Sequence, residues 1–258
     1  MIKFENTVLP SPEQWKAIIM GARNPMNSWD RSDSYITHIE DPETLETADY
    51  QFFIGEKDHE LLMKLAKGGS VHAKYRRTID MFVDITAPLY WWKEFDTYKV
   101  STVANSTSTM HKLMSKPITI DCFEIDDFEN IIFPEEFQRA ELKYPIDPDV
   151  IQMVLIPYLE YLRQQWLKLQ ELIQLPSGDV EYIKSLEKRA KKIWKELVRW
   201  LPEAWLQKRT ITMNYENLLG MCSKGQRRFH KLNEWSGVDN PNLTNFISWT
   251  RTLLRKRR

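Results

Sequence analysis

The sequence predicts an α+β fold that is rich in helices and contains a small, mostly antiparallel sheet. Apolar residues recur at the helical period through most of the chain, and one clear stretch alternates with a period of two. The 258 residues are 42% hydrophobic, which is enough to bury a sizeable core. Because no repeat or low-complexity linker interrupts the chain, we expect residues 1–258 to form a single domain.

Two helices are predicted in the N-terminal part. Ser11-Pro12-Glu13-Gln14 has the pattern of a capping box with proline at the first helical position, so a helix should run from there toward Gly21. Residues 56–67 carry leucines at helical spacing, and Gly68-Gly69 is a helix-ending signal.

The next segment changes period. Ile79, Met81, Val83 and Ile85 alternate with polar residues, which predicts a half-buried strand. Pro88 should end this strand, and residues 89–98 return to a helical pattern with many aromatic side chains.

The C-terminal half reads mainly as helices. After an acidic stretch at 121–136, Asp147-Pro148 opens a helix to about residue 175, which Pro157 could kink. A second helix follows Ser177-Gly178, and we expect the two to form an antiparallel hairpin. Further helices are predicted at about 210–222 and 240–254.

Composition narrows the classes of function. Lys plus Arg and Asp plus Glu each number 36, so the formal net charge is zero, and this argues against nucleic acid as a partner. The basic tail 255–258 is then expected to be a solvated terminus. No apolar run is long enough for a membrane span or a signal peptide, so we expect a soluble, cytoplasmic chain, in the host cytoplasm if the protein is viral.

Several common chemical sites have no motif here. With only 8 glycines, the chain has neither a GxGxxG fingerprint nor a P-loop. Cys122 and Cys222 lie a hundred positions apart and form no CxxC motif, and the five histidines show no metal-ligand spacing. We therefore expect no metal site.

A polar run follows the aromatic helix. Its hydroxyl and amide side chains could hold a phosphate or a heterocycle by hydrogen bonds, with Lys99 or Lys112 supplying charge. On composition alone, a surface loop that caps the next helix is the better interpretation. The run contains Thr97, Ser101, Thr102, Asn105, Ser106, Thr107, Ser108 and Thr109.

The segment 87–113 resembles the signature region of the flavin-dependent thymidylate synthases, the ThyX family. In that family a strand leads through Ala-Pro and an aromatic helix into Arg-His-Arg, two further residues, Ser, and then Ser-x-Arg. Ala87-Pro88 and Lys112-Leu113 match the two ends without a gap. Between them, Lys99 stands at the second arginine, Thr102 at the first serine and Thr107 at the second.

The resemblance continues outside this segment. Arg199 begins an Arg-x-Leu-Pro sequence, Met213-Asn214 resembles a later element, and His230 follows Arg227 and Arg228 as in the stretch that closes the family's nucleotide site. Arg23-Asn24-Pro25 also lies where the family contributes to that site. The likeness covers about two thirds of the chain, and residues 117–185 match weakly, like an insertion.

The departures from the family pattern concern its charged residues. Thr97 replaces the first arginine, Tyr98 the histidine and Thr109 the last arginine, while Glu94 stands where glutamine is usual. Threonine cannot replace the bidentate recognition of phosphate by arginine. The chain is then either a divergent, viral-type branch with a rebuilt site or a retained fold with a changed role.

The resemblance implies an enzyme that transfers a one-carbon unit from methylenetetrahydrofolate to dUMP, giving dTMP. FAD would be the cofactor, NADPH the reductant, and a homotetramer would place the sites at subunit interfaces. A protein cysteine nucleophile is not used in this family. Two alternatives remain open: an enzyme that makes another modified pyrimidine nucleotide, such as a hydroxymethyl product, and a non-catalytic nucleotide-binding or structural protein that has lost flavin.

The resemblance also implies site residues. Arg199 and Ser108 are the expected catalytic residues, and either Arg227 or Arg228 is the phosphate contact. The flavin would be faced by Lys99, Thr102, Asn105 and Asn214. The nucleotide would be held by Ser106, Thr107, Ser108, Arg199 and Arg227.

Overall fold

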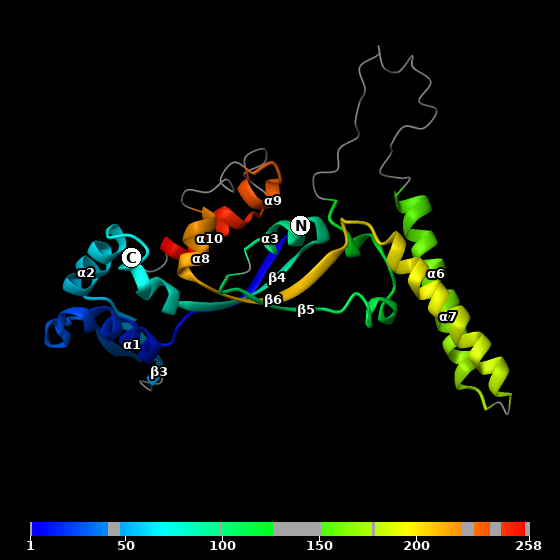
Figure 1. The fold of residues 1–258 in the computed structure, drawn as a ribbon, viewed down its shortest axis with the longest axis horizontal. Helices are drawn as coiled ribbons and strands as arrows, with labels where there is room; N and C mark the ends of the chain where they lie inside the picture. The colour runs from blue at the N-terminus through cyan, green and yellow to red at the C-terminus, as the bar shows by residue number, and fades with distance from the viewer. Residues whose placement is uncertain are drawn as a thin grey trace, which may run out of the picture. The chain divides into compact units, whose positions relative to one another are not determined.

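The computed structural model describes residues 2–40, 47–98, 100–125, 151–176, 179–222, 230–237 and 244–255. The chain divides into two compact units. The first contains residues 1–2, 86–94 and 106–208, and the second contains residues 3–85, 95–105 and 209–258. Helices and strands occur together with helices in excess, so the predicted α+β, helix-rich class is confirmed (Figure 1).

The second unit contains most of the short elements. In chain order they are β1 (Lys3–Val8), α1 (Pro12–Arg23), η1 (Asn24–Met26), η2 (Trp29–Arg31), β2 (Tyr35–Glu40), β3 (Thr47–Phe53), α2 (Glu56–Lys67), η3 (Ala73–Thr78), α8 (Tyr215–Cys222), α9 (Asn233–Ser236) and α10 (Phe246–Arg255). Strands β2 and β3 pair antiparallel, with a register shift at Ile39/Glu40. The three N-terminal strands β1, β2 and β3 were not predicted.

The first unit is built around two long helices. Its elements are η4 (Leu113–Ser115), η5 (Ile120–Cys122), η6 (Ile151–Leu155), α6 (Ile156–Gln174) and α7 (Val180–Trp200). Four elements have residues in both units: β4 (Asp80–Pro88), α3 (Leu89–Phe95), β5 (Val103–Ser106) and β6 (Leu206–Asn214). The four-stranded sheet has the order β1-β4-β6-β5.

The two predicted N-terminal helices are confirmed as α1 and α2. The Ser11 hydroxyl accepts from the Gln14 amide at 3.3 Å, and the Gln14 side chain accepts from the Ser11 amide at 2.8 Å, which completes the capping box. Helix α2 ends at Gly68 as expected.

Strand β4 follows the predicted alternation. Met81, Val83 and Ile85 are fully buried, whereas Phe82 between them is exposed. The strand ends at Pro88, and α3 begins at the next residue. This short connection places an aromatic helix directly after a buried strand.

The predicted hairpin is also confirmed. Leu159 and Leu162, near the start of α6, share a core cluster with Leu197 near the end of α7, whereas Leu169 packs on Leu186 and Ala190. The two helices are therefore antiparallel, and Figure 1 shows them side by side. Pro157 lies in the first turn of α6, directly after the π-helix η6, so it stands where the π-helix passes into the α-helix.

One predicted helix is partly wrong. Residues 206–214 form strand β6, so the helix expected from Thr210 begins only at Tyr215. Ile211 and Met213 are fully buried and are separated by a single residue, which is strand periodicity. The predicted start of the last helix, Asn240-Pro241, lies outside the described residues, as do 126–150 of the weakly matching region and 256–258 of the tail.

Candidate functional site

Helix α3 is anchored by backbone bonds at its first turn. The amides of Leu89 and Tyr90 donate to the carbonyls of Trp205 and Glu203, at 3.1 and 3.2 Å. The indole of Trp92 donates to the Gln207 carbonyl at 2.9 Å. Because the Trp91 and Trp92 side chains are buried, the aromatic helix is core and offers no exposed stacking surface for a ligand.

Strand β5 presents the central residues of the polar run. All four of its residues are exposed, including Asn105 and Ser106. Within the described part of the chain, neither of these two side chains has a hydrogen-bond partner. An amide and a hydroxyl so exposed can bond the alternating donors and acceptors at the edge of a pyrimidine or flavin ring.

The neighbouring hydroxyls have local partners. Thr102 donates to the Tyr98 carbonyl at 2.6 Å, and Ser108 accepts from the His111 amide at 2.9 Å. Thr107 is held through its backbone, since its amide donates to the Lys208 carbonyl and its carbonyl accepts from the Gln207 side chain, both at 2.9 Å. These bonds agree with the interpretation of the polar run as a surface loop whose side chains stabilise the loop itself.

Arg199 lies in the last turn of α7 with an exposed side chain. Its guanidinium pairs with Glu196 on the preceding turn, and the same carboxylate accepts from the Trp200 indole at 2.7 Å. An exposed pair of this kind adds little stability and can exchange its partner. Arg199 can therefore turn from Glu196 to a phosphate at small energetic cost.

Asn214 is buried and serves as a helix cap. Its side-chain oxygen accepts from the Asn217 amide at 3.1 Å, and the Asn217 side chain accepts from the Asn214 amide at 3.2 Å. The pair satisfies amides at the start of α8. Asn214, which was expected to face the flavin, thus already has a partner within the chain.

The remaining predicted residues include several outside the described part of the chain. Lys99, Arg227 and Arg228 all lie there. His230 is described, and its Nδ1 accepts from the Leu232 amide at 3.0 Å, which makes it part of a turn.

The predicted site residues fall into both units. Thr102, Asn105 and Asn214 belong to the second unit, whereas Ser106–Ser108 and Arg199 belong to the first. Within the first unit, the Trp194 indole donates to the Met110 carbonyl at 2.9 Å, which joins α7 to the loop after Ser108. The structure therefore brings α7 and this loop together, while Arg199 itself contacts Glu196.

A cavity in the second unit was not predicted. It has a volume of about 710 Å³ and lies among α1, η3 and the beginning of β4. Its walls are mainly apolar, and the polar side chains at its surface include Gln14, His72, Lys74 and Asp80. A mainly apolar cavity with a few polar groups has the character of a small-molecule site. The small residues Ala17, Gly21 and Ala22 on one side of α1 were the available sequence signal.

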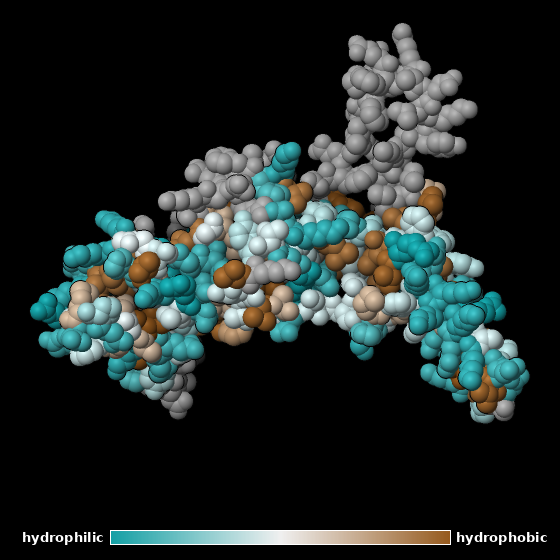
Figure 2. Space-filling model, viewed as in Figure 1, coloured by the Kyte–Doolittle hydropathy of each residue, from teal (hydrophilic) through white to brown (hydrophobic). Residues whose placement is uncertain are grey.

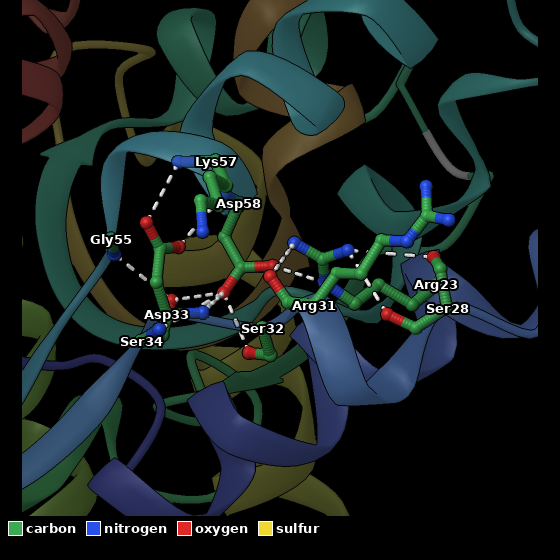
Figure 3. A network of polar contacts seen from close by, with 9 residues as sticks. All are labelled: Arg23, Ser28, Arg31, Ser32, Asp33, Ser34, Gly55, Lys57 and Asp58. Carbon is green, nitrogen blue, oxygen red and sulfur yellow. Dashed lines mark hydrogen bonds and ion pairs between the residues drawn. The ribbon is translucent and has the colours of Figure 1, made fainter.

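Arg23 is buried in a network of polar contacts, shown in Figure 3. Its guanidinium pairs with Asp58 of α2 and donates to the carbonyls of Ser28 and Arg31, at 3.1 and 3.0 Å. Burial alone would raise the pKa of Asp58, but hydrogen bonds from Ser34, Ser32 and Arg23 outweigh it and hold the pKa below its ordinary value. Arg23 thus joins α1 to α2 and is not available to a nucleotide.

Asp33 completes this network at the beginning of α2. Its carboxylate accepts from the amides of Lys57 and Asp58, at 3.0 and 3.1 Å. These bonds cap the helix. The network is therefore a structural one in which the polar groups bond one another.

Cys222 is the buried one of the two cysteines. Burial raises the pKa of the Cys222 thiol to about 11, so it is protonated at neutral pH and poorly suited to nucleophilic attack. Nowhere in the described ranges do three His, Cys, Asp or Glu side chains gather as they would around a metal ion. None of the helices described has a sufficiently long apolar stretch to span a bilayer.

Comparison with known proteins gives structural likenesses only. No protein-family profile matches the sequence, and no curated protein matches it. A flavin-dependent thymidylate synthase ThyX from Helicobacter pylori, complexed with FAD and dUMP, is 13% identical with a TM-score of 0.45, and the match covers 98% of this chain and 91% of that one.

Two other solved structures show a similar likeness. A second structure of ThyX from Helicobacter pylori with FAD and dUMP is 13% identical, with a TM-score of 0.44, over 88% of this chain and 87% of that one. The UMP/dUMP methylase PolB from Streptomyces cacaoi, bound with 5-Br dUMP, is 13% identical, with a TM-score of 0.48. The match covers 100% of this chain and 90% of that one.

Similarity at this level concerns the fold, so the function is argued from the residues of this chain.

Proposed function

We propose that the chain is a divergent enzyme of the flavin-dependent thymidylate synthase type, which transfers a one-carbon unit from methylenetetrahydrofolate to dUMP and gives dTMP. The observation that carries the proposal is the segment that leads from β4 through the buried helix α3 to the exposed strand β5. The order of these elements is that of the signature region. At its end, Asn105 and Ser106 expose an amide and a hydroxyl.

The donor set fits a heterocyclic ligand better than a phosphate. Asn105 and Ser106 can bond ring edges. Of the predicted cations that are described, Arg199 is paired with Glu196, Arg23 is buried and paired with Asp58, and Lys112 is exposed. In the proposed site Arg199 binds the nucleotide phosphate, and Lys99 and Arg227 supply the further positive charge that Thr97 and Thr109 cannot. FAD supplies the redox chemistry when bound.

The roles of the protein residues are binding and orientation. Asn105 holds the flavin ring, while Ser106, Thr107 and Ser108 orient the pyrimidine and stabilise charge that develops on it. Thr102 and Asn214 shape the flavin side through the loop and helix they stabilise. NADPH is the proposed reductant, and a homotetramer completes the site at subunit interfaces, which light scattering would test.

A second candidate is a nucleotide-binding protein without catalysis. It is favoured by the local bonds of Thr102, Ser108 and Asn214, each of which already has a partner within the chain. An enzyme that makes a hydroxymethyl pyrimidine nucleotide is the remaining alternative, since Thr97, Tyr98 and Thr109 replace charged residues of the signature region.

The direct test is the visible absorption spectrum of the purified protein with FAD, before and after addition of dUMP. We expect retained flavin bands that shift with dUMP. The double variant Asn105→Ala/Ser106→Ala should lose the shift, whereas the control Gln51→Ala/Ser70→Ala, which alters exposed polar residues elsewhere, should keep it. A protein that never retains FAD would sink the flavoenzyme and leave the nucleotide-binding candidate.

A further inference from the structure

Helix α7 concentrates positive charge in a chain whose net charge is zero. Between Val180 and Trp200 it has seven Lys or Arg residues and three Glu residues, a net charge of +4. The zero net charge of the whole chain does not reveal this local excess of positive charge. The basic residues are Lys184, Lys188, Arg189, Lys191, Lys192, Lys195 and Arg199.

Four of these lysines form a single row. Their spacing of four, three and four residues places them within an arc of about 60° at 100° per residue, along about 16 Å of helix. The row faces away from Leu186, Ala190 and Leu197, which are buried against neighbouring parts of the first unit. We name Lys184, Lys188, Lys191 and Lys195 the lysine row.

The lysine row is open to a partner. All four side chains are exposed, and among the residues that the structure describes none of them has an ion pair or hydrogen bond. Figure 2 shows hydrophilic residues along the hairpin and apolar ones at its tip. Like charges three and four residues apart weaken a helix, so the row is maintained at some cost to the stability of α7.

A regular row of cations matches a polymer of regularly spaced anions. Proteins that bind single strands combine positive charge with aromatic side chains on which bases stack. The exposed aromatic residues of α7, Tyr182 and Trp200, lie about 160° around the helix from Lys184, on a different side. The row therefore offers phosphate contacts without base stacking.

A membrane surface fits the arrangement less well. The exposed apolar residues Leu172, Leu175 and Val180 lie at the hairpin tip, and the exposed Tyr161 and Trp200 lie toward its other end. A surface-binding amphipathic helix carries its apolar face along its length beside the basic one. In α7 the long apolar face is buried against α6, and the exposed part of the helix carries the cations together with Glu181 and Glu187.

We propose that the lysine row binds the phosphate backbone of duplex DNA, without reading the base sequence. The proposal assigns none of the four lysines to the nucleotide site, although Arg199 of that site lies on the same helix, one turn after Lys195. Because the net charge of the chain is zero, the protein as a whole should not attract DNA strongly. The local positive charge of the lysine row should nevertheless bind DNA at low and moderate salt.

The test is fluorescence anisotropy of a short labelled DNA duplex titrated with the full-length protein. The variant Lys184→Gln/Lys188→Gln/Lys191→Gln/Lys195→Gln keeps good helix formers and should lose at least tenfold in affinity. Since each phosphate contact to a duplex contributes a slope of about −0.9 to log K against log salt, the variant should also lose about 3 to 4 from that slope.

The matched control removes four exposed lysines from α1 and α2: Lys16→Gln/Lys57→Gln/Lys64→Gln/Lys67→Gln. It has the same change in net charge and should bind the duplex as the wild type does. Equal losses in the two variants, or no wild-type binding at low salt, would overturn the proposal. So would binding of phosphatidylserine vesicles in preference to the duplex.

Discussion

The network around Arg23 and the strand β5 use similar polar residues in opposite ways. In the network, Arg23, Asp58 and Ser34 are bonded to one another and to the backbone, and both charged side chains are buried. On β5, Asn105 and Ser106 are exposed and have no partner within the described part of the chain.

The partners of each polar group separate the structural cluster from the candidate binding residues. A polar group whose bonds are all made inside the protein stabilises the fold and has little left for a ligand. An exposed group without a partner contributes little to stability and is free to bind. Changes at the network should therefore cost stability, and changes on β5 should cost ligand binding.

The largest loss of stability is expected at Asp58. Asp58→Asn leaves the buried Arg23 guanidinium without its countercharge, so we expect the free energy of unfolding to fall by about 3–5 kcal/mol. Urea denaturation measures it. The control is Lys93→Ala, which breaks the exposed Lys93–Glu203 pair and should cost less than about 1 kcal/mol. Similar losses in both variants would contradict the comparison.

A smaller loss is expected at Glu160. Its carboxylate accepts from Arg163 and from the Ile118 amide, both at 2.8 Å, which joins α6 to the segment before it. Glu160→Gln removes this charged acceptor, so we expect the free energy of unfolding to fall by about 1.5–3 kcal/mol.

The same residue should give the stability a defined pH dependence. The hydrogen bond from Arg163, opposed by burial and aided by the Ile118 amide and Gln164, lowers the pKa of Glu160 from 4.5 to about 2. The contribution is complete above the unfolded pKa and is lost as pH falls from about 4.5 to about 2. Urea denaturation across this window should show a steeper decline for the wild type than for Glu160→Gln, and parallel declines would refute the assignment.

A still smaller loss is expected at Asn214. Asn214→Ala removes a cap of α8, so we expect about 1 kcal/mol of destabilisation. The thermal midpoint measures it. If Asn214 also contacted flavin, its loss would weaken FAD binding far more than this local cap explains, and an FAD titration of the variant would separate the two roles.

The smallest change in stability is expected on β5. Asn105→Ala/Ser106→Ala should alter the free energy of unfolding by less than about 0.5 kcal/mol, because both side chains are exposed. Affinity for dUMP, measured by calorimetry, should nevertheless fall at least tenfold. A large loss of stability with unchanged affinity would reverse the roles assigned to the two regions.

Local patterns predicted much of the fold. The capping box at Ser11, the alternation in β4 and the apolar stripes of α6 and α7 all depend on residues near one another in sequence. Strand β6 was mistaken for the beginning of a helix because its burial comes from pairing with β4 and β5, which are distant in sequence. Strand β1, which pairs with the distant β4, was missed for a similar reason, whereas β2 and β3 pair with each other and were missed although they are neighbours in sequence.

The candidate site was predictable only in part. The order of β4, α3 and the polar run could be predicted from the signature region, and Asn105 and Ser106 are exposed as a ligand-binding role requires. The capping role of Asn214 and the ion pair of Arg199 with Glu196 could not be predicted, because the type of a residue does not reveal which residue it will bond. The cavity beside α1 likewise depends on how α1, η3 and β4 meet.

The most direct test of the proposed function is the mass of the nucleotide formed when the protein is incubated with dUMP, FAD, methylenetetrahydrofolate and NADPH. We expect a product heavier than dUMP by one methyl group in place of a hydrogen, and we expect this product to be absent with Arg199→Ala although that variant stays folded. A hydroxymethyl product would redirect the chemistry to the alternative enzyme. Unchanged dUMP in the presence of bound FAD would contradict catalysis.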